Sequence, residues 1–270
     1  MNPSSFARPD DRAMRRLMLA IKPWQKVTDP VFFGMERVPS DGPLLFVGNH
    51  TLYGVLDAPL LFMELYRHHG IFLRSLGDHL HFKIPLWREL LTQHGVVDGT
   101  RENCGALMDA GESILVFPGG AREVAKRRGE SYQLLWGERL GFARMAIRHK
   151  CTIVPFAAVG AEEMFEIIFD ADDLLATPAA ALVDRLGIRR GAIPPLARGI
   201  GPTMIPRPER FYFHIGEPIP MDAFGTDAED DTQAARLRDQ TRAAVAEGVA
   251  FLLQQRRRDP RRKLIHRLLG

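Results

Sequence analysis

Residues 46–57 read Phe-Val-Gly-Asn-His-Thr-Leu-Tyr-Gly-Val-Leu-Asp, and the rest of the chain can be interpreted outward from them. The apolar run over 44–47 predicts a strand in the core of a sheet. Gly48-Asn49 is a turn signal that ends this strand and leaves His50 at its carboxyl end. Because open α/β sheets build their sites at the carboxyl ends of strands, the sequence predicts a site at His50.

Asp57 stands just before an apolar segment, residues 58–66, which predicts a helix. A carboxylate can hold one imidazole nitrogen so that the other accepts a proton, and His50 with Asp57 would then be a general base and its orienting group. The alternative is a histidine with satisfied hydrogen bonds and an aspartate that caps the helix. The stretch alone leaves both interpretations open.

Apolar runs and turn signals alternate along the whole chain. Thr100 is a candidate cap for one of the helices. The pattern predicts an α/β fold with a mostly parallel or mixed central sheet, flanked by helices and followed by a long C-terminal helix. The expected strands are 31–35, 44–47, 71–74, 95–97, 113–117, 152–156 and 211–215, and the expected helices are 58–66, 86–91, 101–110, 138–149, 174–186 and 229–257, with irregular chain between 187 and 208.

The 270 residues are 46% hydrophobic, which is enough for a sizeable core, and they carry a net charge of +3. That charge is uneven: residues 1–30 carry +3, the last 15 residues carry +6, and the body between them is acidic. We therefore expect three parts, namely an amphipathic N-terminal helical segment (1–30), a main domain (31–257) and a basic C-terminal tail (258–270). Basic ends indicate an anionic partner such as a phospholipid surface.

The N-terminal segment predicts a basic amphipathic helix over 11–22 that ends at Pro23-Trp24. This helix could pack on the body or lie on a membrane surface, and the tail could be solvated, folded on the body or bound to lipid. No run approaches the roughly 18 apolar residues that a membrane span requires. Two cysteines fit a reducing compartment.

Two more loops are expected near His50, because each follows a predicted strand. Residues 98–101 end in Arg101, and residues 117–123 contain Gly119-Gly120 followed by Arg122 and Glu123. A Gly-Gly turn leaves backbone N–H groups that can bind a phosphate or stabilise an oxyanion, and arginines suit phosphate. The alternative is an ordinary tight turn.

The sequence lacks the motifs of several other classes of enzyme. The chain contains no Gly-x-Ser-x-Gly, no phosphate-binding loop with Gly-Lys-Ser/Thr and no Gly-x-Gly-x-x-Gly. The pairs His68-His69 and His79-x-His81 have no matching carboxylate or cysteine cluster nearby in sequence. We therefore predict neither a metal site nor a bound cofactor.

The order of these loops resembles the glycerolipid acyltransferase superfamily. The similar blocks are Asn49-His50 with Asp57, residues 95–101, Phe-Pro-Gly-Gly-Ala-Arg-Glu at 117–123 and Val-Pro-Phe at 154–156. The third block, together with residues 213–219, looks nearer the monoacylglycerol and diacylglycerol acyltransferase branch. The resemblance implies acyl transfer from acyl-coenzyme A or acyl carrier protein to a lipid hydroxyl. It implies His50 and Asp57 as the catalytic pair, with Asn49, Arg101, Gly119, Gly120, Arg122 and Glu123 around the oxyanion and the substrates.

Two departures from the family pattern matter. Members with phosphorylated acceptors have four residues between His and Asp, whereas six separate His50 from Asp57 here. On a straight helix that spacing is about 10 Å, so the chain must loop, and Gly54 is the expected place. Those members also carry Glu where this chain has Gly119, which favours a neutral lipid or alcohol as the acceptor.

The resemblance and the basic ends together predict a peripheral enzyme at the cytoplasmic face of an anionic membrane. Two rival functions remain open: a thioesterase or ester hydrolase that uses water in the same site, and a peripheral lipid-binding protein without turnover. Nucleic acid is not an expected partner, because the body is acidic and aromatic residues do not alternate with the basic residues of the tail.

Overall fold

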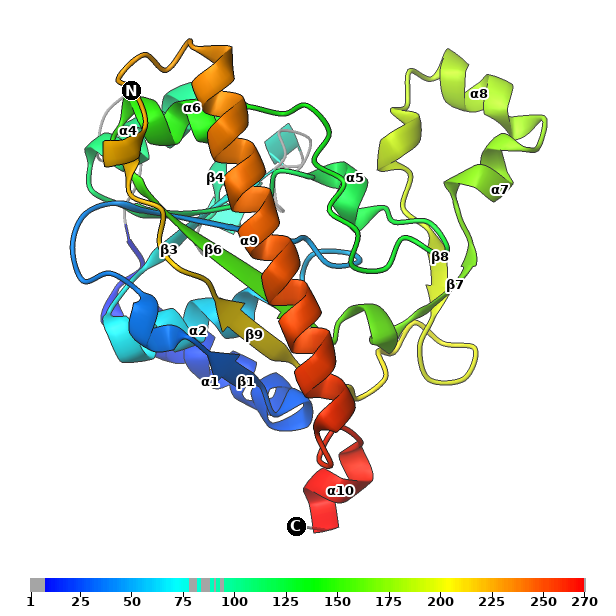
Figure 1. Cartoon of the computed structure of the whole chain (residues 1–270). Coiled ribbons are helices and arrows are strands. Elements are labelled where there is room, and N and C mark those ends of the chain that lie inside the picture. The colour runs from blue at the N-terminus through cyan, green and yellow to red at the C-terminus, as the bar shows by residue number, and fades with distance from the viewer. Residues whose placement is uncertain (1–7, 78–81, 84–87, 90, 93–94, 270) are drawn as a thin grey trace.

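The computed structural model describes residues 8–77, 82–83, 88–89, 91–92 and 95–269. Within them, one seven-stranded sheet has the order β1-β9-β6-β2-β5-β3-β4. Strand β9 is antiparallel to β6, and the other pairs are parallel. The expected α/β fold with a mostly parallel or mixed sheet is therefore confirmed (Figure 1). The strands are β1 Val31–Phe33, β2 Leu44–Gly48, β3 Leu73–Gly77, β4 Val97–Asp98, β5 Ser113–Val116, β6 Thr152–Val159 and β9 Tyr212–Ile215.

Helices cover both faces of the sheet, and this explains the continuous apolar run of β2. Leu45 and Val47 belong to the core cluster under one helical layer, while Leu44 and Phe46 belong to the cluster under the other. A strand buried on both faces has no polar side to alternate with. The first layer contains α4 Arg101–Asp109, α6 Gly141–Arg148 and α9 Asp231–Arg258, and the second contains α1 Asp11–Thr28 and α2 Ala58–His69.

Helix α1 continues past Pro23, so the predicted end at Pro23-Trp24 is wrong. A proline removes one backbone donor, but its φ suits a helix. Trp24 offsets that loss because its Nε1–H donates to the Leu56 carbonyl at 2.8 Å and its ring packs edge-on against Phe211. The apolar stripe of α1 packs on the core, with Met14 buried, so it is not a free lipid-facing surface.

Strand limits differ from the prediction by a few residues. The first strand stops at Phe33, because Gly34 has φ +75° and a Cβ there would lie 2.4 Å from the Ile215 carbonyl oxygen. The third and fourth strands begin two residues later than predicted, at Leu73 and Val97. The predicted helix over 86–91 falls largely outside the described residues.

Residues 166–207 form a lobe, here called the cap, that projects beyond the sheet (Figure 1). The single helix predicted over 174–186 is instead two short helices, α7 Ala171–Leu175 and α8 Ala179–Arg185, with Pro178 at the start of the second. The irregular chain predicted after 186 is wrong in part, because β8 Leu196–Arg198 pairs antiparallel with β7 Glu166–Phe169. Proline signals are local, and they do not reveal a partner strand on the far side of two helices.

The C-terminal tail folds on the body. Helix α9 leads into α10 Leu264–Leu269, and Arg267 donates to the carbonyls of Val27 at 2.9 Å and Pro208 at 2.7 Å. Just after α9, Asp259 accepts hydrogen bonds from Arg210 and Tyr212. In the part of the chain that the structure describes, no helix has the length and apolar character to cross a membrane.

Candidate active site

His50 lies at the carboxyl end of β2, between β5 and β6. Its ring stacks on Phe117, which follows β5, with the ring centroids 3.8 Å apart and the planes within 4° of parallel. His50 as a whole residue is half-buried, and its neighbours Asn49 and Thr51 are buried. The loops over 49–57 and 117–123 therefore meet at this ring, as predicted from strand order.

Two buried side chains hold the main chain of His50 on both sides. Glu123 Oε2 accepts from the His50 N–H at 3.1 Å, and Lys126 Nζ donates to the His50 carbonyl at 2.9 Å. The other Glu123 oxygen accepts from the Leu135 N–H at 3.0 Å, and Lys126 also pairs with buried Glu162. The position of the imidazole thus depends on a carboxylate and an ammonium group that come from one short segment.

Gly119 leaves the space that Glu123 occupies. A Cβ built on Gly119 would lie 2.1 Å from the Glu123 carboxyl carbon, so no larger residue fits beside it. The structure therefore gives a physical account of the departure at this position. Phosphate-acceptor members carry a glutamate at the position of Gly119. Here that glutamate is absent, and the carboxylate of Glu123, four residues later in the chain, occupies the space beside Gly119.

The electrostatics of the site favour a neutral imidazole. Burial lowers the pKa of His50 to about 3, with the Lys126 charge as a second cause. Burial also raises the pKa of Glu123 to about 7, against the opposing effect of Lys126. An imidazole that stays unprotonated at neutral pH can accept a proton, but so low a pKa makes it a weaker base than one that titrates near neutral pH.

A tight turn at Gly54 leaves room for one edge of the His50 ring. Tyr53 and Gly54 both have left-handed φ, +61° and +65°, and the Gly54 N–H donates to the Thr51 carbonyl at 3.0 Å. A Cβ on Gly54 would lie 2.7 Å from His50 Nε2 and 2.3 Å from Cε1. The chain therefore loops at Gly54, as expected from the long spacing between His50 and Asp57.

Asp57 is buried close behind this turn as the N-cap of α2. Its Oδ1 accepts from the Ala58 N–H at 2.9 Å. Asp57 Oδ2 and His50 Nδ1 are both buried, and neither makes a hydrogen bond. Burial raises the pKa of Asp57, and hydrogen bonds to it oppose that rise in part. No hydrogen bond joins the Asp57 carboxylate to the His50 imidazole, so the predicted orienting contact is not formed in this structure.

The Gly-Gly turn offers two backbone donors. The Gly120 N–H is used within the turn, where it donates to the Phe117 carbonyl at 3.0 Å. Among the described residues, the N–H groups of Gly119 and Ala121 donate to no backbone carbonyl. Arg139, which the sequence did not single out, donates to the Pro118 carbonyl at 2.7 Å and also to that of Gly119, and so fixes the turn.

The other predicted site residues, Asn49, Arg122 and Arg101, lie in three different surroundings. Asn49 is buried and bonds with both amide atoms to the backbone of Ala158 on β6, at 2.8 and 2.9 Å. Arg122 pairs with Glu130. Arg101 is exposed at the start of α4, after β4, which lies three strands from β2. At about 4.8 Å per strand, the sheet keeps Arg101 roughly 14 Å from the His50 strand.

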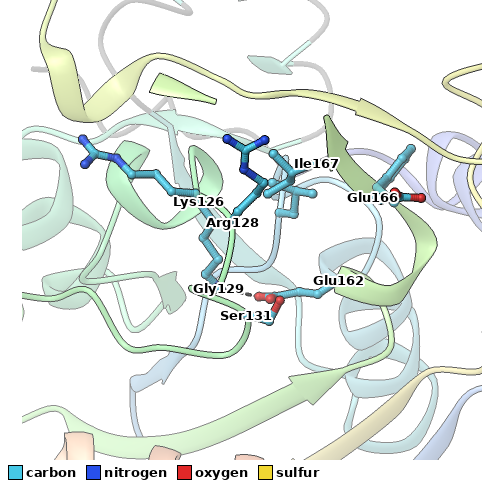
Figure 2. Close-up of a pocket in the computed structure, with 10 residues that line it drawn as sticks. Lys126, Arg128, Gly129, Ser131, Glu162, Glu166 and Ile167 are labelled. Atoms are coloured by element: carbon cyan, nitrogen blue, oxygen red, sulfur yellow. Dashed lines mark hydrogen bonds and ion pairs between the residues drawn. The ribbon is translucent and has the colours of Figure 1, made fainter. Parts of the chain in front are cut away.

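A cavity of about 340 Å³ lies between the body and the cap, on the side of Lys126 (Figure 2). Lys126 and Glu162 line it from the body, and Glu166 and Ile167 line it from the cap. Arg128 at its edge bonds through its N–H to Asp170 at 3.0 Å. The cavity thus adjoins the support of His50 and not the ring itself.

Sequence reasoning missed Lys126 and Glu162. Lys126 stands three residues after Glu123, a spacing that brings two side chains to one side of a helical turn, and this was the one available signal. Glu162 follows β6 in the chain, and no local sequence pattern predicted that it would be buried beside Lys126.

Comparisons with known proteins identify several that are similar to this chain. Residues 30–159 match the family model described as Acyltransferase. Phytyl ester synthase 2 of Arabidopsis thaliana is 31% identical over 251 residues, which cover 87% of this chain and 36% of that protein. A human protein, "DGAT1/2-independent enzyme synthesizing storage lipids", is 33% identical over 146 residues, or 51% of this chain and 44% of that protein. The chain spans little more than a third of the plant relative's length.

Among solved structures, a 1-acyl-sn-glycerophosphate acyltransferase from Thermotoga maritima matches with a TM-score of 0.49 and 16% identity, over 92% of this chain and 85% of that one.

Proposed function

Residues 30–159 match the acyltransferase family, and from this premise we propose that the chain transfers a fatty acyl group from an acyl thioester to the hydroxyl of a lipid. The observation that carries the proposal is the His50 imidazole, held by Glu123 and Lys126 at the carboxyl end of β2, with Gly54 packed against its Nε2–Cε1 edge. The thioester is that of coenzyme A or acyl carrier protein. No metal and no bound cofactor take part.

In the proposed reaction, His50 Nε2 takes the proton of the acceptor hydroxyl while the oxygen attacks the thioester carbonyl. Asp57 stabilises the imidazolium from the Nδ1 side. The N–H groups of Gly119 and Ala121 stabilise the oxyanion of the tetrahedral intermediate. The C–S bond then breaks, and the thiolate takes the proton back from His50. No covalent intermediate forms with the protein.

The acceptor we favour is a neutral lipid or a long-chain alcohol. Two observations support this choice: a phosphate would meet Arg122 already paired with Glu130, and Gly119 stands where phosphate-acceptor members carry Glu. The similar proteins include a phytyl ester synthase and an enzyme synthesizing storage lipids.

We also propose that the protein works peripherally, at an anionic lipid surface on the cytoplasmic face. Exposed basic residues at both ends support this idea, including Arg12 and Lys22 on α1 and Arg257, Arg258 and Lys263 near the C-terminus. Each cation near an anionic surface contributes about 1 kcal/mol. The N-terminal segment, the main domain and the tail, as divided from the sequence, stay predictions.

The test is an incubation of the pure protein with labelled acyl-coenzyme A and a panel of acceptors: glycerol phosphate, lysophospholipid, mono- and diacylglycerol, and a long-chain alcohol. We expect an acylated neutral product that disappears with His50→Ala. The control is His68→Ala, an exposed histidine paired with Glu64 on α2, which should act like the unchanged protein. Because a general base gives about 10² to 10⁴-fold, a His50→Ala variant with most of its activity would reject the mechanism.

Two other outcomes identify the rival functions. Free fatty acid without an acylated lipid would indicate a thioesterase or ester hydrolase that uses water as the acceptor. No turnover with either acyl-coenzyme A or acyl-carrier-protein donors, together with retained lipid binding, would indicate a lipid-binding protein.

A further inference from the structure

Exposed apolar side chains gather on the cap. Of the thirteen large apolar side chains that are exposed in the described residues, nine lie between 168 and 205. Isolated exposed apolar residues are ordinary, but a concentration in one lobe marks an interaction surface. The densest part is the loop over 199–206, Gly-Ile-Gly-Pro-Thr-Met-Ile-Pro, here called the apolar loop.

The apolar loop is uncharged and presents three large side chains to solvent. Ile200, Met204 and Ile205 are 51%, 56% and 60% exposed. The backbone holds them there without help from a core, because the Gly199 N–H donates to the Thr203 carbonyl at 2.7 Å and the Ile200 N–H donates to the Ile205 carbonyl at 2.8 Å. The loop is thus a preformed apolar projection, which loses little conformational entropy when it inserts into another phase.

Positive charge surrounds the base of this loop. Arg198 and Arg207 stand at its two ends and share one carboxylate, that of Glu166, so the base carries a net positive charge. The basic C-terminal segment is fastened just beyond it, because Arg267 donates to the Pro208 carbonyl at 2.7 Å and Arg256 donates to Glu209 at 2.8 Å. Arg257 and Arg258 are exposed beside these anchors in the sequence.

An apolar projection within a cationic surround matches one partner in particular, the interface of an anionic lipid layer. Apolar side chains enter the acyl-chain boundary there, and arginines meet the phosphates of the headgroups. We propose that the apolar loop inserts into an anionic lipid surface and, with the basic C-terminal segment beside it, docks the protein for reaction. This inference rests on the proposed function in one respect: docking would bring the site to a lipid acceptor.

The cap also contacts the loops of the candidate site. Tyr53 beside Gly54 donates through its hydroxyl to the Pro195 carbonyl at 3.0 Å, and its ring packs edge-on against Phe165. On the other side, Gly191 lies against the side chain of Arg122. The lobe that would touch lipid therefore rests directly on the loops that hold His50.

The test is co-sedimentation with vesicles of phosphatidylcholine containing phosphatidylserine, without turnover. We expect Met204→Ser combined with Ile205→Ser to weaken the partition by about tenfold or more, because two large side chains lose their apolar surface. The matched control is Leu182→Ser combined with Leu186→Ser. These residues are 57% and 63% exposed, but they lie at and just after α8, at the opposite end of the β7–β8 ribbon, so binding should persist.

Unchanged binding of the loop variant would overturn the proposal, and so would equal losses in both variants. Equal binding to pure phosphatidylcholine vesicles would reject the role of the cations. If light scattering shows a dimer that the loop variant converts to a monomer, while vesicle binding stays the same, the loop contacts a second copy and the proposal is wrong. Because none of these measurements needs catalysis, they stay decisive even if the His50→Ala test removes the proposed function.

Discussion

Glu123 holds the main chain of His50 through a hydrogen bond of 3.1 Å from the His50 N–H, and its second oxygen accepts from Leu135 at 3.0 Å. One buried carboxylate thereby fixes both the candidate base and the chain that follows the Gly-Gly turn. Glu123 is best described as a positioning residue, since its bonds are to the backbone of His50.

Replacement of Glu123 by Ala should destabilise the protein strongly. Two partly buried N–H groups would lose their acceptor, and each such loss costs about 1–3 kcal/mol. We expect the free energy of unfolding, measured with urea, to fall by about 2–5 kcal/mol. The control is Glu138→Ala, because Glu138 is 94% exposed and pairs only at the surface with Arg238. A Glu123→Ala variant as stable as this control would contradict the role of Glu123.

The raised pKa of Glu123 predicts a stability change with pH. The carboxyl group has a pKa of about 7 in the folded protein against 4.5 otherwise, so the folded state binds the proton more tightly. Its contribution is therefore fully present below pH 4.5 and is lost as the pH rises to 7, by about 3 kcal/mol at 1.36 kcal/mol per pKa unit.

The measurement is the difference in unfolding free energy between the unchanged protein and Glu123→Gln, taken from pH 4.5 to 8. The difference isolates Glu123 from other titrating groups, His50 and Asp57 among them. We expect the stability of the unchanged protein to decline relative to the variant between pH 4.5 and 7 and to level off above it. Parallel curves would mean that burial does not shift this carboxyl group.

Gly54→Ala should damage the site more than the fold. A Cβ at position 54 would lie 2.3 Å from His50 Cε1, so the ring must move. Gly42→Ala is a matched control, because Gly42 has a similar φ of +79° but nothing within 4 Å of its Cβ. Both variants should lose about 1–2 kcal/mol of stability through the left-handed backbone, but only Gly54→Ala should lose acyl transfer, by about 100-fold. Equal activities would show that the Nε2 edge is not used.

The sequence predicted the parts of this site that depend on strand order. His50, Gly119 and Glu123 follow adjacent strands, and a parallel sheet brings them together. Arg101 was predicted to lie near His50, but β3 and β5 separate its strand from β2. The order of strands in the sheet cannot be inferred from their order in the chain. The same limit hid Lys126 with Glu162, since that pair joins segments from two different strands.

The helices and strands were predictable where apolar runs are long. The prediction failed where a single tertiary contact determines where an element ends. The five buried residues of β2 announced a strand covered on both faces. Helix α1 continued through Pro23 because Trp24 reaches the Leu56 carbonyl, a contact with chain 32 residues away. The β7–β8 pair was missed because its strands are short and two helices separate them.

Gly119→Ala tests the close approach of Gly119 and Glu123 as a pair. A Cβ on residue 119 would lie 2.1 Å from the Glu123 carboxyl carbon, so the single variant should lose stability and activity. In a Glu123→Ala background that clash disappears, and the added cost of Gly119→Ala should be close to zero. A double-mutant cycle on unfolding free energy measures the coupling, which for residues in contact is about 0.5–3 kcal/mol. Additive effects would mean that the two residues act separately.

The pH dependence of acyl transfer tests the state of His50. With a pKa of about 3, the imidazole stays neutral through pH 5–8, so kcat/KM should show no acid limb near the ordinary histidine value of 6.5. Lys126 contributes to this lowering after burial. Lys126→Met combined with Glu162→Gln removes that charge without leaving buried Glu162 unpaired, so the acid limb should move upward in pH while burial keeps it below 6.5. A limb near 6.5 that persists in Glu123→Gln, where the carboxyl group with a pKa of about 7 is removed, would show that the base in the reaction is a solvated histidine, or that it is not His50.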